Sequence, residues 1–151
     1  MLRLSNLADY AVLVMTAVAR GAPGAVPVSA AQVAHLSGVS APTVAKLLGQ
    51  LGRAGLLRSA RGVAGGFTLA RPAEEVSLAD IVEAIDGPIA LTHCTHGETD
   101  CDLAGCCPVR PHWEPVNRAV RTALAAVSLA QILPAHAAHR APVSLGEGMG
   151  A

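Results

Sequence analysis

The sequence predicts a mainly α-helical protein with one small β-hairpin and a long helix near the C-terminal end. The chain has 151 residues, a usual length for a single domain. Hydrophobic residues make up 52% of it, but aromatic residues only 2%, and 30 residues are alanine. Because alanine and leucine cost little in a helix while strands favour aromatic and β-branched residues, this composition favours a helical core. No apolar run reaches the roughly 20 residues that span a bilayer, so we expect no membrane segment.

An amphipathic stripe near the N-terminus predicts the first helix. Its apolar residues recur at helical spacing, at Leu7, Ala11, Val14, Met15 and Val18. A secretory signal is the alternative, because Arg3 precedes an apolar stretch that ends in the triplet Ala17–Ala19. Polar residues interrupt that stretch, namely Ser5, Asn6, Asp9 and Thr16. We therefore expect the first helix of a cytoplasmic protein.

Two short helices separated by a turn are predicted next. Ser29 follows a Gly/Pro-rich loop over 21–27 and is a suitable N-cap for a helix that continues to Leu36. Gly38 breaks this helix, and Ser40 is the expected cap of the next one. The apolar stripe of the second helix comprises Val44, Leu47, Leu48 and Leu51. This arrangement is the helix-turn-helix pattern. The outward face of the second helix carries small or polar residues suited to a DNA major groove, namely Pro42, Thr43, Lys46 and Gln50.

A glycine-rich hairpin follows directly. Leu56–Ala60 and Phe67–Ala70 are short strand candidates on either side of a tip over 61–66 that contains three glycines. Arg61 lies at the base of this tip, where its side chain is suited to the negative potential of a DNA minor groove. An ordinary glycine-rich hairpin is the alternative. Its place after the helix-turn-helix indicates a wing, so the first 75 residues are expected to form a winged helix-turn-helix domain.

The remaining chain divides into three further segments. Ser77 and Asp80 have capping-box spacing and begin a predicted helix to about Ile85, within a linker and cysteine-rich loop over 76–111. A final helix is expected from about Pro115, with one further turn over 128–133, giving a dimerisation helix over 112–133. Residues 134–151 are expected to be a disordered tail. Such a terminal helix commonly packs against a second copy of the chain; folding back on its own core is the alternative.

Formal charge is distributed unevenly, although the chain is neutral overall. Residues 1–72 carry a net charge of +6, residues 73–109 a net charge of −8, and residues 110–151 a net charge of +2. Six of the seven basic residues in the first segment are arginine, which suits bidentate contacts to phosphate and guanine. The order of helix-turn-helix and basic hairpin in this segment therefore predicts binding to a double-stranded DNA operator.

Four cysteines lie within fourteen residues, at Cys94, Cys101, Cys106 and Cys107. Disulfides are disfavoured in a cytoplasmic protein. A zinc site is possible, but the usual pairs of short CxxC knuckles are missing. An iron–sulfur cluster held mainly by thiolates on a long loop is the third interpretation. Because neighbouring thiolates repel one another and this segment has no lysine or arginine, a metal centre is expected, and the spacing favours a cluster over zinc.

These motifs together resemble a known family. Arg3-Leu4-Ser5 and Tyr10-Ala11, the wing residues 61–67, and the spaced cysteines followed by Trp113 are similar to the IscR/NsrR-type iron–sulfur transcription regulators. The resemblance covers about residues 2–133, and the segments around Val116–Ala119 and Val127–Ala130 look most like the branch that regulates SUF cluster assembly. It implies a dimeric winged-helix protein whose cluster state sets its affinity for DNA.

The resemblance also implies site residues. Cys94 and Cys101 match the first two cluster cysteines, and Cys107 best matches the third, with Cys106 as its alternative. The histidine that serves as fourth ligand in ISC regulators is Arg110 here, with His112 nearby, whereas Asp9 matches the aspartate that nitric-oxide sensors donate from the partner subunit. On the DNA side, the matching residues are Ser40, Pro42, Thr43, Lys46 and Arg61. A glutamate that some ISC regulators use for operator discrimination is Ala45 in this chain.

The expected function is that of a homodimeric transcription regulator, a repressor of SUF-type iron–sulfur assembly genes, with a [2Fe-2S] or [4Fe-4S] cluster. No phosphate-binding loop or nucleophile elbow is present, so an enzyme is not expected. The alternatives are a zinc-stabilised adaptor, a metal-free thiol redox switch, and a repressor that responds to nitric oxide.

Overall fold

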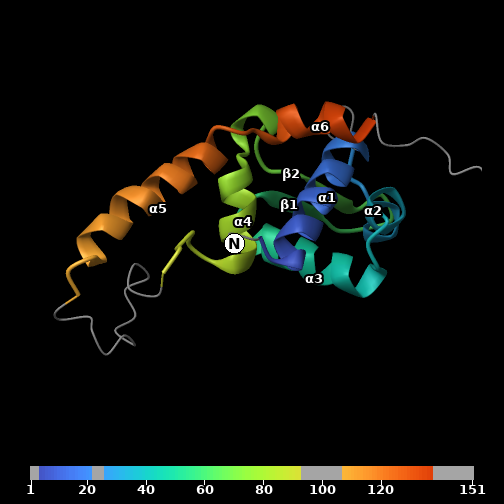
Figure 1. The fold of residues 1–151 in the computed structure, drawn as a ribbon. Helices are drawn as coiled ribbons and strands as arrows, with labels where there is room; N and C mark the ends of the chain where they lie inside the picture. Colours follow the sequence, from blue (N-terminus) through green and yellow to red (C-terminus); the bar gives the residue numbers. More distant parts are fainter. Residues whose placement is uncertain (1–3, 22–25, 93–106, 138–151) are drawn as a thin grey trace, which may run out of the picture.

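A computed structural model describes residues 4–21, 26–92 and 107–137. Its elements in chain order are α1 (Asn6–Gly21), α2 (Ala30–Ser37), α3 (Ala41–Arg53), β1 (Leu57–Ala60), β2 (Gly66–Leu69), the short 3-10 helix η2 (Ala73–Glu75), α4 (Leu78–Asp86), α5 (Arg110–Ala125) and α6 (Leu129–Ala137). In Figure 1, α1 to α4 and the hairpin form the body, α6 lies across one end of α1, and α5 extends away from the body on the side of α4. Cys94, Cys101 and Cys106 lie outside the described residues.

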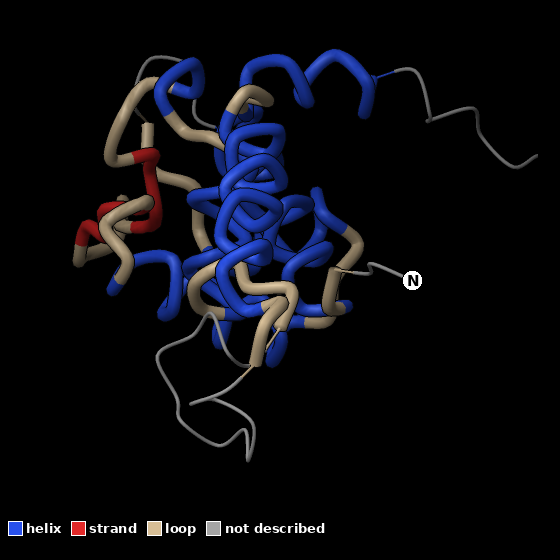
Figure 2. The backbone as a smooth tube through the Cα atoms, turned by 60° about the vertical axis from the view of Figure 1, so that its left-hand side comes forward, coloured by secondary structure: helices blue, strands red, loops and turns tan. Residues whose placement is uncertain are grey.

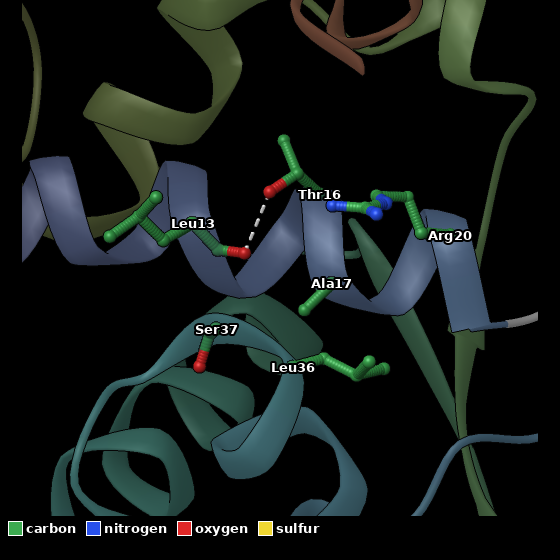
Figure 3. Close-up of a pocket in the computed structure, with 6 residues that line it drawn as sticks. All are labelled: Leu13, Thr16, Ala17, Arg20, Leu36 and Ser37. Atoms are coloured by element: carbon green, nitrogen blue, oxygen red, sulfur yellow. Dashed lines mark hydrogen bonds between the residues drawn. The ribbon is translucent and has the colours of Figure 1, made fainter. Parts of the chain in front are cut away.

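The helix-turn-helix consists of α2 and α3 packed against α1. The predicted stripe of α3 is confirmed, because Val44, Leu47, Leu48 and Leu51 are all buried. Ser29 forms a full capping box with Gln32, and Gly38 ends α2 with φ 72°, a left-handed conformation that glycine adopts without strain. Figure 3 shows Ala17 of α1 directed toward Leu36 of α2 at the seam between these helices. The gap there is only about 30 Å³, hardly more than a water molecule needs, so the seam is a packing contact.

The hairpin forms as predicted, except that the first strand begins one residue later and the second is shifted by one residue toward the N-terminus. β1 and β2 are antiparallel, with Leu57 opposite Leu69 and Ala60 opposite Gly66. The strands lie together at one side of the helices (Figure 2). Phe67 and Val28 exchange two backbone hydrogen bonds of 2.8 and 3.0 Å, which attach the hairpin to the segment before α2. Gly66 permits this contact, because a Cβ at that position would lie 2.5 Å from the Val28 carbonyl oxygen.

The C-terminal helices differ from the prediction. α5 begins at Arg110 rather than near Pro115, because Pro111 occupies the first turn, where its missing N–H costs nothing. α6 is separate from α5, because the turn over 126–128 is attached to the start of α4. The Leu78 N–H donates to the Val127 carbonyl, and the Leu129 N–H donates to the Val76 carbonyl. α6 also continues to Ala137, so residues 134–137 belong to a helix rather than to the expected tail. Within the described ranges, no helix is long and apolar enough to cross a membrane.

The capping box of α4 is confirmed and carries a pH prediction. Ser77 Oγ accepts from the Asp80 backbone N–H, and Asp80 Oδ2 accepts from the Ser77 backbone N–H. Burial alone would raise the pKa of Asp80, but its hydrogen bonds with Ser77 and the charges of Arg71 and Arg121 outweigh burial and lower it. The ionised carboxylate therefore stabilises the folded state above the usual pKa of 3.8, and this contribution is lost as pH falls through the lower folded value.

Asp80→Asn is the variant that tests this contribution, because it keeps an acceptor oxygen and removes the charge. We expect it to lower the free energy of unfolding by about 1 kcal/mol or less at pH 7. We also expect a weaker loss of stability than in the wild type as pH falls below 4. Urea unfolding at several pH values measures both effects, and parallel pH profiles for the two proteins would contradict the assignment.

Candidate nucleic-acid interface and cysteine-rich segment

The exposed side of α3 carries the predicted DNA-reading residues. Ser40, Pro42 and Lys46 are exposed, Thr43 is half-buried, and the apolar stripe of the helix faces the core. Ser40 occupies the N-cap position, but its side chain makes no capping bond, which corrects that detail of the prediction. Instead, its hydroxyl lies 2.9 Å from the Thr43 hydroxyl. This pair places two hydroxyl groups at the N-terminal end of the helix that would enter a major groove.

The hairpin presents its tip to solvent. Arg61 is exposed at the base of the tip, and Val63 is fully exposed. Gly65 folds so tightly against the hairpin that a Cβ there would lie 2.4 Å from the Ala60 carbonyl oxygen. The tip therefore has little bulk beside the arginine, which fits a minor-groove contact.

Arg53 is a candidate that the sequence interpretation missed. It ends α3 and lines, with Ser59 and Phe67, a cleft of about 310 Å³ between this helix and the hairpin. Arg53 is exposed between α3 and the hairpin, the two elements that are predicted to contact DNA. The available signal for Arg53 was its place at the end of the predicted second helix. Helical spacing alone, however, does not show that this end of the helix lies beside the hairpin.

The predicted metal ligands do not converge within the described residues. Cys107 is a half-buried free thiol just before α5. Asp9 is exposed in the first turns of α1, and His112 is exposed near the start of α5. Among the residues that the structure describes, no three His, Cys, Asp or Glu side chains are grouped as a metal site requires.

The first flank of the cysteine-rich segment is attached to α5, and the second flank leads directly into that helix. Before the segment, the Leu91 backbone N–H donates to Asn117 Oδ1 of α5 at 2.9 Å. Ser5 accepts from the Ala8 N–H at the start of α1 and donates to Asp86 Oδ1 at 2.7 Å, which joins α1 to the end of α4. After the segment, Cys107 leads through a short turn into α5. The segment thus connects α4 and α5.

A bidentate ion pair joins α5 to α4. Arg121 Nε lies 2.8 Å from Glu83 Oε1, and its Nη2 lies 3.1 Å from Glu83 Oε2. Hydrogen bonding and attraction to the Glu83 carboxylate raise the pKa of Arg121. α4 in turn packs against α1 and α3. A continuous set of contacts therefore leads from α5 to the helix-turn-helix.

Comparison with known proteins decides the family. Residues 4–135 match the family described as Rrf2, iron-dependent transcriptional regulators. The chain belongs to the Rrf2 family. It is thus a transcription regulator with a winged helix-turn-helix, not an enzyme, and the predicted fold class is confirmed.

Individual Rrf2 relatives agree with this assignment. The chain is 34% identical over 145 residues to a predicted HTH-type transcriptional regulator of Mycobacterium tuberculosis, an alignment covering 93% of this chain and 89% of that protein. The structure of T. potens IscR matches with a TM-score of 0.65 and 28% identity, over 96% of this chain and 94% of that one. CymR, the global cysteine regulator of B. subtilis, matches with a TM-score of 0.69 and 26% identity, over 89% and 98% of the two chains.

Proposed function

We propose that this Rrf2 protein is a homodimeric repressor whose affinity for its operator depends on an iron–sulfur cluster. Cys94, Cys101 and Cys107 would hold the cluster, with Cys106 as the alternative to Cys107. The fourth ligand would be Asp9 of a second copy of the chain or, less favourably, His112. From the resemblance to the SUF branch, we propose iron–sulfur assembly genes as its targets.

The chemistry of the available donors fits this group. Thiolates are the preferred ligands of iron–sulfur clusters, and four cysteines lie in a segment without lysine or arginine. Cys107, the one described cysteine, is free and half-buried, so its sulfur has no competing partner among the described residues. When bound, a cluster supplies covalent cross-links among these thiolates.

The single observation that carries the proposal is the hydrogen bond that attaches the chain just before the cysteine-rich segment to α5. The Leu91–Asn117 bond holds its first flank on α5, and Cys107 begins its second flank at the same helix. α4 contacts α1, α3 and α5, so a change in these flanks reaches the recognition helix through packed elements. An affinity difference of 5- to 150-fold between the two states is the usual size of such coupling.

The exposed face of α5 supports the dimer. Apolar residues Val116, Ala119 and Ala123 lie on it at helical spacing and are exposed, and Val127 in the turn after the helix is exposed as well. Val120 and Leu124 are half-buried and line a cleft with α4 and the 87–91 stretch. α5 thus has one face on its own chain and a second apolar face for another copy.

Anaerobic purification tests the cofactor. We expect a coloured, oxygen-sensitive protein that contains iron and acid-labile sulfide. Colourless protein with stoichiometric zinc would overturn the proposal in favour of a zinc-stabilised adaptor.

A metal-free thiol switch is the second candidate. It is favoured by the adjacent Cys106 and Cys107 and by the likeness to CymR, whose structure is described as that of a cysteine regulator. This candidate predicts that reductant alone changes operator affinity after chelator treatment. The iron–sulfur proposal predicts no such change.

Arg61→Ala tests the DNA side of the proposal. The substitution removes the exposed cation at the base of the hairpin tip, so we expect operator binding to weaken by about 1–3 kcal/mol. The operator is first selected from random DNA duplexes, and affinity is measured by fluorescence anisotropy at one fixed salt concentration.

Arg118→Ala is the matched control for this test. Arg118 lies on α5, its side chain is 71% exposed, and within the described part of the chain its ion pair is with Glu114, at 3.6 Å. We expect this variant to retain wild-type affinity. Equal affinities of the Arg61→Ala variant and the wild type would argue against a reading hairpin.

A further inference from the structure

Asn117 is a buried polar residue in the middle of α5. It is 7% exposed, and among the described residues the only other buried polar side chain is that of Thr16. The Thr16 hydroxyl donates to the Leu13 carbonyl within its own helix. Asn117 instead accepts from the backbone of Leu91, 26 residues earlier in the chain. Its hydrogen bond is therefore a tertiary contact between two separate elements.

Leu91 lies where the chain leaves α4 for the cysteine-rich segment. Gly87 ends α4 with φ 84°, and residues 88–91 then run beside Val120 and Leu124 of α5. A backbone N–H in such a place needs a partner once it is removed from water. Asn117 Oδ1 provides this partner only when Leu91 lies directly opposite it. The bond thus selects one position of the 88–91 stretch along α5.

An apolar residue at position 117 would also be buried there, but it would not select one position of the 88–91 stretch along α5. Hydrophobic contacts tolerate sliding, whereas a buried hydrogen bond has a narrow range of distance and angle. The nearby Arg121–Glu83 pair cannot replace the bond, because it joins α5 to α4 itself and its arginine side chain is 54% exposed. That pair fixes α5 on α4 but leaves the 88–91 stretch without a fixed position along α5.

We infer that Asn117 is a positioning residue that couples the cysteine-rich segment to α5 through its hydrogen bond with Leu91. The inference rests on the proposed function, since the event to be coupled is the change between cluster-loaded and cluster-free protein. A change of state shifts the 88–91 stretch, and the bond transmits this shift to α5. Without the acceptor oxygen, the stretch moves independently of α5, and the two states differ less in operator affinity.

Two substitutions separate the hydrogen bond from the packing of the side chain. Asn117→Leu keeps a similar size and removes the acceptor. Asn117→Asp keeps an acceptor oxygen in the same place in either protonation state. Arg118→Ala is the control on the same helix, because it removes an exposed ion pair with Glu114 within α5 and leaves Asn117 and the Arg121–Glu83 pair in place.

The experiment measures two quantities under strict exclusion of air. The first is the ratio of operator dissociation constants for cluster-free and cluster-loaded protein. The second is the hydrogen-exchange rate of the Leu91 amide in each state, measured on the full chain. We expect Asn117→Leu to lower the ratio by a factor of at least about 3 and to accelerate exchange at Leu91, with unchanged iron and sulfide content. Asn117→Asp and Arg118→Ala should keep at least most of the wild-type ratio.

Contrary outcomes are distinct for this inference and for the proposed function. A wild-type ratio of 1 would overturn the proposed function and, with it, the coupling. A wild-type ratio above 5 that is unchanged in Asn117→Leu would overturn only the role of Asn117. The same conclusion would follow if Asn117→Leu lost the ratio only because it no longer held iron. Should Asn117→Leu fail to fold, the wild type still decides: the Leu91 amide must be protected from exchange in both states, because the bond has to persist to transmit the shift, and an unprotected Leu91 amide in either state would contradict the inference.

Discussion

Replacing Cys101 with serine is expected to abolish retention of the iron–sulfur cluster. The serine hydroxyl is a harder, more weakly coordinating donor than a thiolate, and a cluster held by three cysteines loses one of its main ligands. We expect the iron and sulfide content of the anaerobically purified variant to fall by a factor of about ten or more. Operator affinity should then equal that of cluster-free wild-type protein, whichever direction that change takes.

The neighbouring cysteines provide the matched controls for this result. Cys106→Ser should retain iron, whereas Cys107→Ser should lose it, because Cys107 matches the third ligand and leads directly into α5. The reverse result would exchange the roles of these two residues and leave the proposal intact. Full iron content in Cys101→Ser would contradict the ligand set.

Leu47→Ala is expected to cause the largest loss of stability. Leu47 is fully buried in the apolar stripe of α3 and belongs to the hydrophobic core. Truncating such a leucine leaves a cavity and typically costs about 2–5 kcal/mol of unfolding free energy. Urea unfolding measures this loss, with variant and wild type at the same protein concentration because dimerisation makes the apparent stability depend on it.

Leu36→Ala is the matched control, because the same side-chain atoms are removed from a residue 38% exposed on the adjacent helix. We expect it to cost about 1 kcal/mol or less. If both variants lost the same stability, the face of α3 assigned to the core would be wrong.

Local sequence patterns predicted most of the N-terminal domain because each element there carries its own signal. The stripe of α3 has helical spacing, Ser77 and Asp80 form a recognisable cap, and Gly38 marks a turn that needs a left-handed residue. These signals act within a few residues of one another, so a single sequence reveals them.

Long-range contacts were not predictable in the same way. The Val28–Phe67 bridge joins backbone groups, which leave no mark in residue type, and the Leu91–Asn117 bond joins a backbone N–H to a side chain 26 residues later, a pairing that a single sequence does not reveal. The break between α5 and α6 has the same origin, because the 126–128 turn is attached to the start of α4. The early start of α5 could have been inferred from Pro111, since proline favours the first turn of a helix.

The candidate site likewise has a part that local patterns predict and a part that depends on long-range packing. The exposed residues of α3 and Arg61 follow from the period of one helix and the position of one hairpin, so they could be predicted. Arg53 lies between the two elements, which only their packing shows. The cysteines were found by their number and spacing, but Cys94, Cys101 and Cys106 lie outside the described residues, so their ligand roles remain proposals.

Titration of the selected operator with cluster-loaded and cluster-free protein tests the central claim most directly. Both samples come from one anaerobic preparation, the second after removal of iron by a chelator, at the same salt concentration. The account predicts dissociation constants that differ by a factor of at least about 5, and reconstitution with iron and sulfide should restore the first value. Identical constants for the two samples, with iron and sulfide verified in the first, would contradict it.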